Sequence, residues 1–356
     1  MTRPQQATRE YLAAPIRKIG VLAWFKDNLF NTWYNSFLTI ITLIGLWFVV
    51  PPFFKWAFID SLWNSPAEAC RDIEGACWSI IPNNIKFIML GFFPEGQEWR
   101  PILAMSLLLA LVIYSKERTR WNKFLGWYWA FGLIIMGTLM YGGLFGMPVV
   151  ETAQWSGLPL TMMLSFFGMV AAYPLGVLLA IGRRSKMPAI KTLCVVYIEM
   201  IRGVPLISLL FMSSILFPLF LPDGMTIDKV LRAQVAIILF TAAYIAEVVR
   251  GGLQAMPRGQ YEAADSLGLN YRQTMRLIIL PQALKIVIPP TVGILLSAFK
   301  DTSLVVIIAL YDVLKTTKVT LSNPKWTGYS TEAYIFLAVL YFVCCFPNFV
   351  FGNVHL

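Results

Sequence analysis

Long apolar runs recur through most of the chain, and they constrain its fold more than any other feature. An α-helix needs about 20 apolar residues to cross the hydrocarbon core of a bilayer. The chain of 356 residues is 58% hydrophobic and 13% charged, whereas soluble domains average about a quarter charged residues. The sequence therefore predicts an all-α polytopic membrane protein with about eight transmembrane helices. We expect these at about 33–54, 101–114, 124–147, 158–181, 193–221, 230–253, 286–310 and 333–351.

The charged residues indicate orientation rather than nucleic-acid binding. The net charge is +10, but the basic residues lie beside the apolar runs and not in one patch. They cluster in residues 1–26, 116–123, 183–191 and 250–285. By the positive-inside rule these segments face the cytoplasm, so both termini are expected there. The connection 312–332 carries three lysines on the outer side, against the rule.

The termini and the cysteines add further expectations. Residues 1–26 lack the short apolar core and small-residue cleavage site of a signal peptide, so the first apolar run is expected to remain as a span. The single histidine, His355, gives no basis for a histidine metal site or triad. Cys70 and Cys77 share a polar outer loop, where an oxidising compartment favours a disulfide; two free thiols are the alternative.

The most informative polar stretch is the 254–283 segment, between the sixth and seventh apolar runs. It predicts a short helix over 260–267, a left-handed turn at Gly268 and a second helix over 271–280 that ends before Pro281. Alanines at 263 and 264 permit close approach of another backbone, and arginines at 258, 272 and 276 add positive charge. A polar helix-turn-helix on the cytoplasmic side indicates a soluble partner. The alternative is an ordinary amphipathic loop.

Ionisable residues inside spans are costly and therefore are candidate functional residues. Glu199 and Arg202 lie three apart, on one helical face, just before a hinge at Gly203 and Pro205. Glu247 and Arg250, which follow Tyr244, repeat the same spacing. Two interpretations stay open: structural ion pairs near the cytoplasmic interface, or pairs that gate a pathway.

The seventh run contains adjacent opposite charges. By helical rise Lys300 lies about 20 Å from the start of the run, well inside the membrane. An amino-acid zwitterion needs complementary charge in a dry cavity, and Asp301 is a candidate partner for its ammonium group. Thr302 and Ser303 offer hydroxyl groups. Alternatively, Lys300 extends toward the interface and Asp301 joins two helices.

Several of these stretches resemble a known family. Glu262-Ala263-Ala264, Gly268 and Ile279-Leu280-Pro281 are similar to the EAA loop of bacterial ABC-importer permeases. Together with 197–205, 246–251, 281–283 and 300–304, they resemble the polar amino-acid permeases of the histidine/glutamine type. The patterns at 75–78, 91–94 and 99–101 are similar to the longer general L-amino-acid permease subunits. The C-terminal residues 352–356 lack the basic tail that is usual in those relatives.

The resemblance implies a fold, a location and partners. It implies a type I importer core with a cytoplasmic coupling helix, in a bacterial inner membrane. The implied partners are a homologous second permease in a heterodimer, two ATPase subunits, a periplasmic amino-acid-binding protein, the amino-acid substrate and the lipid bilayer, with no nucleic acid. The arrangement of the spans divides the chain into an accessory region 1–150, with three spans and a periplasmic loop at about 55–100, and a five-helix core 151–356 with its coupling loop at 254–283; the resemblance agrees, because the longer permease subunits carry extra N-terminal spans.

The resemblance also assigns residues. The expected ATPase-coupling residues are Arg258, Gly259, Glu262, Ala263, Ala264, Gly268, Arg272 and Pro281. The expected substrate-pathway or gating residues are Glu199, Arg202, Tyr244, Glu247, Arg250, Lys300, Asp301, Thr302 and Ser303. No G-x-x-x-x-G-K-[ST] loop is present, so the chain is not expected to be an enzyme or to hold a cofactor. ATP and Mg would be bound by the partner ATPase.

The sequence leaves other functions to be weighed. An ion-coupled secondary transporter would need an internal inverted repeat and a carboxylate relay; no repeat is visible, and the 254–283 segment would be left without a role. A further alternative is a membrane enzyme or a non-transporting assembly subunit. An enzyme would need clustered His, Cys or carboxylate side chains near an interface, and only scattered ion pairs are present. Ile294, with no further acidic residue along the seventh run, favours neutral or acidic amino acids as substrates.

Overall fold

The computed structural model describes residues 20–354, except 116, 121 and 223. The basic segment before residue 20 and His355 lie outside the described residues. The described residues form helices and one two-residue strand, β1 (Tyr311–Asp312), which pairs in parallel with Ser156 and Gly157. The predicted all-α membrane fold is confirmed.

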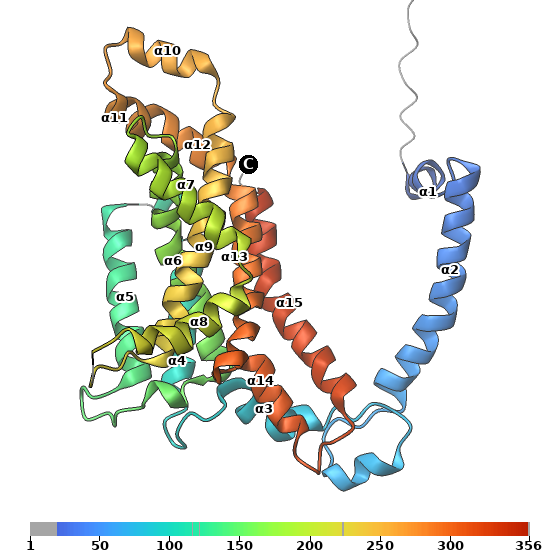
Figure 1. Cartoon of the computed structure of the whole chain (residues 1–356). Coiled ribbons are helices and arrows are strands. Elements are labelled where there is room, and N and C mark those ends of the chain that lie inside the picture. The colour runs from blue at the N-terminus through green and yellow to red at the C-terminus, as the bar shows by residue number, and fades with distance from the viewer. Residues whose placement is uncertain (1–19, 116, 121, 223, 355–356) are drawn as a thin grey trace, which may run out of the picture. The chain divides into compact units, whose positions relative to one another are not determined.

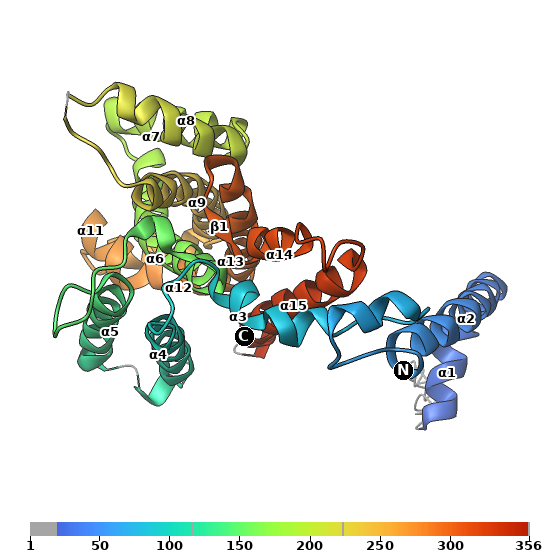
Figure 2. The same ribbon diagram turned by 90° about the horizontal axis from the view of Figure 1, so that it is seen from below.

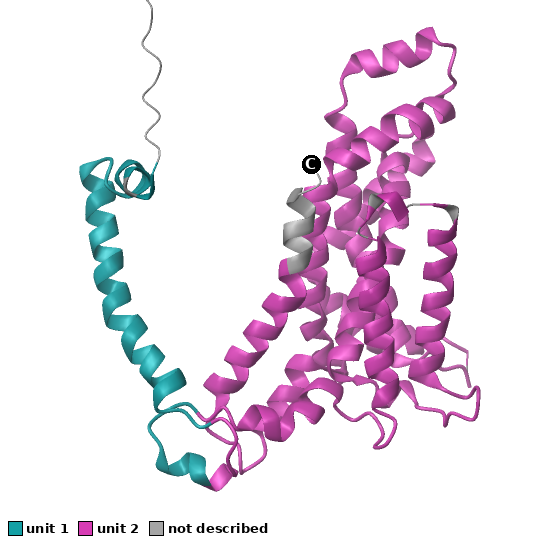
Figure 3. Ribbon diagram, turned by 180° about the vertical axis from the view of Figure 1, so that it is seen from behind, with its two compact units in different colours: residues 1–62, 69–76 teal, residues 63–68, 77–356 magenta. Residues whose placement is uncertain are grey.

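The chain separates into two compact units (Figure 3). Unit 1 consists of residues 1–62 and 69–76, and unit 2 of residues 63–68 and 77–356. Unit 1 contains α1 (Val21–Leu29), α2 (Trp33–Phe54) and η1 (Lys55–Ile59). The short helix η2 (Ala67–Asp72) begins in unit 2 and ends in unit 1.

Unit 2 contains the remaining helices, which Figure 1 shows in chain order. Its first part, up to the sixth apolar run, contains α3 (Ile80–Leu90), α4 (Trp99–Ser115), η3 (Arg118–Arg120), α5 (Lys123–Tyr141), η4 (Thr152–Gln154), α6 (Gly157–Arg183), α7 (Pro188–Gly203), α8 (Leu206–Leu219) and α9 (Lys229–Gln254). Its second part contains α10 (Arg258–Ser266), α11 (Tyr271–Gln273), η5 (Thr274–Ile279), α12 (Leu280–Ile286), α13 (Ile288–Asp301), η6 (Thr302–Ile308), α14 (Val313–Leu321) and α15 (Ser330–Val354).

Each apolar run predicted as a span contains a helix or consecutive helices. Among the described residues, five helices are long and apolar enough to cross a membrane, and a sixth is obtained if α7 and α8 count together. These two helices meet at 104°, so the predicted hinge at Gly203 and Pro205 is a sharp bend. The runs at 101–114 and 333–351 correspond to the shorter apolar helix α4 and to α15.

Helices α6 and α9 form the centre of unit 2 because small residues allow their backbones to approach closely. Figure 2 shows them between α7–α8 on one side and α4–α5 on the other. A β-carbon on Gly176 would lie 2.6 Å from Ile245 Cγ2, and one on Gly168 would lie 2.9 Å from Ile237 Cγ2. Ala172 lies between them at the same spacing and is fully buried. Small residues at every fourth position are a common basis of helix packing in membranes.

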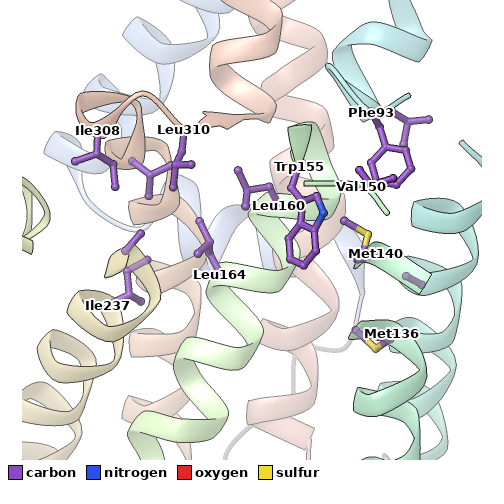
Figure 4. Close-up of a cluster of buried hydrophobic side chains, with 14 of the residues drawn as sticks. Phe93, Met136, Met140, Val150, Trp155, Leu160, Leu164, Ile237, Ile308 and Leu310 are labelled. Carbon is purple, nitrogen blue, oxygen red and sulfur yellow. The ribbon is translucent and has the colours of Figure 1, made fainter. Parts of the chain in front are cut away.

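Two of the accessory helices share a hydrophobic core with the rest of unit 2. The core includes Met136 and Met140 of α5, Leu160 and Leu164 of α6, and Ile237 of α9 (Figure 4). The indole of Trp129 stacks on Phe166, with ring centroids 5.1 Å apart. The predicted boundary near residue 150 therefore separates two segments that pack together in one core. The assignment of residues 1–150 as an accessory region remains a proposal.

The third apolar run ends as a helix earlier than the sequence predicts. We expected a span over 124–147, but α5 ends at Tyr141 because Gly142 turns the backbone at φ +82°. Arg100 holds the turn: its side chain is fully buried and donates hydrogen bonds to Leu139 O at 2.7 Å and Pro148 O at 3.0 Å. The predicted polar loop 55–100 also contains helix α3, which hydrophobicity over a span-length window does not reveal.

Candidate coupling and transport sites

The 254–283 segment folds as a helix, a tight turn and a second helical stretch. Helix α10 ends in the predicted left-handed turn: Gly268 has φ +69°, and its N–H donates to Asp265 O at 2.9 Å. Asn270 then begins the next helix with a capping box, in which it and Gln273 exchange two hydrogen bonds of 3.0 Å. The turn geometry was predictable because glycine adopts a positive φ without a side-chain clash.

Pro281 does not end the second helix, which corrects the sequence-based expectation. The helix widens to π geometry over η5 and then continues through Pro281 as α12 to Ile286. A proline lacks the N–H that an α-helix needs and clashes with the carbonyl four residues earlier. The wider turn removes that conflict. The segment therefore runs without a break to Ile286.

The side chains of α10 divide into an inner and an outer set. Ala264 is fully buried against its own chain, whereas Ala263 and Glu262 are exposed. Arg184 ties the helix to the bundle, because its Nη1 donates to Leu253 O at 2.9 Å and approaches the Tyr261 hydroxyl at 3.5 Å. The other predicted coupling residues with exposed positions are Arg258, Gly259, Gly268, Arg272 and Pro281. Figure 1 shows α10 at one end of unit 2.

Beside this segment lies a cluster of charged side chains, here called the arginine–glutamate cluster. Its members are Arg183, Glu199, Arg202, Glu247 and Arg250. Glu247 is the centre and has 16% of its side chain exposed. It accepts hydrogen bonds from Arg250 at 2.8 Å and Arg183 at 2.8 Å, and its second oxygen lies 3.5 Å from Arg202. Three cations around one carboxylate join the ends of α6, α7 and α9.

The structure changes one of the two ion pairs expected from spacing. Glu247 pairs with Arg250 as predicted. Glu199 contacts Arg183 at 2.8 Å instead of Arg202, and Arg202 turns to Glu247 and to the ring of Tyr244, 5.5 Å from its centroid. Helical spacing shows which residues share a face but not which neighbouring helix lies opposite. In the sequence, Arg183 belongs to the basic segment 183–191, which indicates only the orientation in the membrane. Its membership of the arginine–glutamate cluster was therefore not predicted.

A cavity of about 520 Å³ lies between α8, α9 and α13. Its lining is Leu206, Ile237, Phe240, Thr241, Tyr244, Pro290, Gly293, Ile294, Ser297, Ala298 and Asp301. Tyr244 and Asp301, two of the predicted pathway residues, face this cavity. Among the described residues that line it, Asp301 is the only charged one. The first residue of α8 also lines it, and no side chain caps that helix.

The remaining residues of the predicted 300–303 group lie outside the cavity lining. Thr302 is buried and donates its hydroxyl to Phe299 O at 2.7 Å, while Ser303 is half-buried and Lys300 is exposed. Ser297 was not predicted; it lies four residues before Asp301, one helical turn away on the same face. The four-residue spacing from Asp301 is the sequence feature from which Ser297 could have been predicted to line the same cavity.

The described residues contain no group of three or more His, Cys, Asp or Glu side chains arranged to hold a metal ion. Cys70 and Cys77 are disulfide-bonded, and Cys194, Cys344 and Cys345 form no disulfide.

Comparison with known proteins gives consistent matches over these elements. Residues 172–354 match the family described as binding-protein-dependent transport system inner membrane component. An inner membrane amino-acid ABC transporter permease protein, YhdY of Escherichia coli, is 46% identical over 91% of this chain and 89% of its own. The chain belongs to this family. The family consists of transport components, not enzymes, so the chain is a multi-pass inner membrane transport subunit.

Two further relatives support the same assignment. The glutamate/glutamine/aspartate/asparagine transport system permease protein BztC of Rhodobacter capsulatus is 36% identical over 93% of this chain and 92% of its own. A crystal structure of an amino acid ABC transporter with histidines matches with a TM-score of 0.50 and 30% identity, over 56% of this chain and 90% of that one. The resemblance to polar amino-acid ABC permeases is confirmed.

Proposed function

We propose that the chain imports L-amino acids across the inner membrane by alternating access, driven by a partner ATPase that contacts the 254–283 segment. ATP and Mg bind to that partner, and a periplasmic binding protein delivers the substrate. The assembly contains a homologous second permease and two ATPase copies. In this orientation both termini are cytoplasmic.

The observation that carries the proposal is the division of α10 into buried and exposed alanines. Ala264 fixes the helix to its own chain, and Ala263 next to it is left free. Glu262 is exposed on the same helix, and arginines at 258 and 272 are exposed around it. A partner that fits against Ala263 can approach the helix backbone closely and move the helix as a unit.

Side-chain contacts connect α10 to the helix bundle, so motion of α10 would be transmitted to it. Arg184 contacts the end of α9 and Tyr261 of α10. The neighbouring residue Arg183 belongs to the arginine–glutamate cluster, which joins α6, α7 and α9. We infer that the cluster holds these helix ends together in one state of the transporter and loosens in the other. A ligand or nucleotide shifts such an equilibrium only by binding the two states differently.

The cavity has the chemistry for an amino-acid zwitterion. Asp301 lines the cavity, and its carboxylate would accept the ammonium group; the uncapped N-terminus of α8 at Leu206 favours a carboxylate. Once Asp301 has paired with the ammonium group, the described residues of the lining include no second acid for a cationic side chain. The arginine excess of the cluster attracts anions. We therefore propose neutral or acidic amino acids as substrates, which agrees with the name of the relative from Rhodobacter capsulatus.

The proposal is tested by reconstituting the assembled complex in proteoliposomes with ATP on the ATPase side. We expect uptake of radiolabelled glutamate or glutamine that depends on ATP and on the binding protein. Glu262→Lys combined with Gly268→Asp should abolish both ATPase association and uptake. Unchanged association and uptake in that variant would remove the coupling role of the segment. Uptake that is driven by an ion gradient in the absence of the ATPase would show that the chain is a secondary transporter and not a subunit of an ATP-driven importer.

A further inference from the structure

Segment 311–332, which contains α14, has exposed basic residues but no exposed acidic residue. Within residues 311–332 the basic residues are Lys315, Lys318 and Lys325, here called the lysine patch, and the acidic residues are Asp312 and Glu332. Lys318 and Lys325 are exposed, and Lys315 is half-buried, with its ammonium 5.9 Å from the ring centroid of Tyr311. The patch continues from α14 into the turn that follows it.

Both acids of this segment are turned inward and occupied by backbone donors. Asp312 is fully buried and accepts from the N–H groups of Leu314 at 3.2 Å and Lys315 at 3.0 Å. Glu332 is 5% exposed and accepts from the Cys77 N–H at 2.9 Å. Among the described residues, no salt bridge joins a lysine of the patch to a carboxylate. No carboxylate of the described residues therefore neutralises the three ammonium groups in a salt bridge.

The position of α14 indicates which kind of partner it meets. Figure 1 shows α14 at the end of unit 2 opposite to α10. If α10 faces the cytoplasmic ATPase, the lysine patch faces the periplasm. Lysines in a short translocated connection oppose the orientation that the other basic segments favour, so these three are candidates for a separate role. The family depends on a binding protein, which must dock on the periplasmic surface.

Helix α14 is also held in place by hydrogen bonds to two neighbouring helices. Thr316 donates its hydroxyl to Ile88 O of α3 at 2.7 Å, and Val313 N–H donates to Thr161 of α6 at 3.2 Å. A charged face on a helix that is fixed to two others keeps its geometry when a partner arrives. Such preorganisation reduces the ordering cost of binding.

We propose that Lys315, Lys318 and Lys325 form a docking surface for an acidic face of the periplasmic binding protein. The inference rests on the orientation in the proposed function. Charges at the rim of an interface act mainly on the association rate and its salt dependence. The lysine patch would thus guide the loaded binding protein to the entrance of the transporter.

The test uses the complete complex in phosphatidylcholine proteoliposomes, with the purified binding protein added to the periplasmic side. The variant Lys315→Glu/Lys318→Glu/Lys325→Glu should raise the binding-protein concentration for half-maximal ATPase stimulation by about tenfold at low salt. ATPase activity without the binding protein should stay unchanged. The matching triple arginine variant should behave as the native protein, as should Lys55→Glu, which reverses an exposed charge in unit 1.

Three outcomes overturn the docking surface. An unchanged half-maximal concentration in the triple glutamate variant removes it. Loss of native behaviour in the triple arginine variant indicates a role for shape and not for charge. An effect that appears only in phosphatidylglycerol vesicles, without the binding protein, assigns the patch to anionic lipid. A control measures the orientation of segment 311–332 directly. It labels Lys325→Cys with a membrane-impermeant maleimide after Cys194, Cys344 and Cys345 have been replaced by alanine. Reaction only from the cytoplasmic side would refute the proposed topology itself.

Discussion

Replacing Glu247 by glutamine should uncouple ATP hydrolysis from uptake, because this carboxylate is the shared partner of three arginines. The substitution keeps the shape of the side chain and removes its charge. Hydrogen bonds to charged groups contribute about 1.5–3 kcal/mol each, and breaking a fully buried pair costs about 3–5 kcal/mol. The Glu247 side chain is 16% exposed and its partners are 22–34% exposed, so these values are upper bounds. We expect a loss of about 2 kcal/mol in the state that holds the cluster together.

A matched control is available in the same cluster. Glu199 has 55% of its side chain exposed, and its one salt-bridge partner in the described part of the chain is Arg183. An exposed pair contributes about 0–1 kcal/mol, so Glu199→Gln should differ little from the native protein. Since 1.4 kcal/mol corresponds to a factor of ten, a loss of about 2 kcal/mol shifts the conformational equilibrium roughly 30-fold.

The assay is ATPase activity without the binding protein, together with uptake per ATP hydrolysed in proteoliposomes. Glu247→Gln should raise the basal ATPase rate, lower uptake per ATP and lower the thermal unfolding temperature. Glu199→Gln should leave all three close to native. Equal effects of the two variants would refute the reasoning, because the structure gives their carboxylates very different surroundings.

Three further predictions concern other parts of the chain. Gly268→Val should reduce uptake because a branched residue opposes its positive φ, whereas Gly268→Asn should retain uptake because asparagine tolerates that conformation; normal uptake with valine would contradict this. Asp301→Asn should raise the KM for uptake at least about tenfold and leave basal ATPase unchanged, since a lost charge-assisted hydrogen bond costs about 1.5–3 kcal/mol; an unchanged KM would exclude its contact with the substrate. Peptide mapping without reductant should find Cys70 joined to Cys77, and replacing both by serine should cost up to about 2–3 kcal/mol of stability; a protein that loses no stability would show the bridge to be dispensable.

The sequence predicted the membrane spans well because each span depends on a local property. An apolar run of sufficient length has to be helical in a bilayer, where every backbone polar group needs an internal partner. The bend at Gly203 and Pro205 and the turn at Gly268 were predictable for a similar reason. Glycine and proline limit the backbone wherever they occur.

The contacts between helices were not predictable in the same way. The place of Arg183 in the cluster depends on which helix end lies opposite Glu199 and Glu247. Ala263 and Ala264 are identical in sequence terms, and only packing buries one of them. The continuation of the helix through Pro281 required a π turn, for which the sequence carries no distinct signal. These features arise from tertiary packing.

The proposed contact between α10 and the ATPase is tested most directly by cysteine crosslinking in the assembled complex, with Cys194, Cys344 and Cys345 replaced. Ala263→Cys, at an exposed position, should crosslink to a cysteine on the ATPase in a manner that depends on nucleotide. Ala264→Cys, at a buried position, should not. Reaction of Ala263→Cys with a membrane-impermeant reagent from the periplasmic side, or equal crosslinking at both positions, would contradict the account.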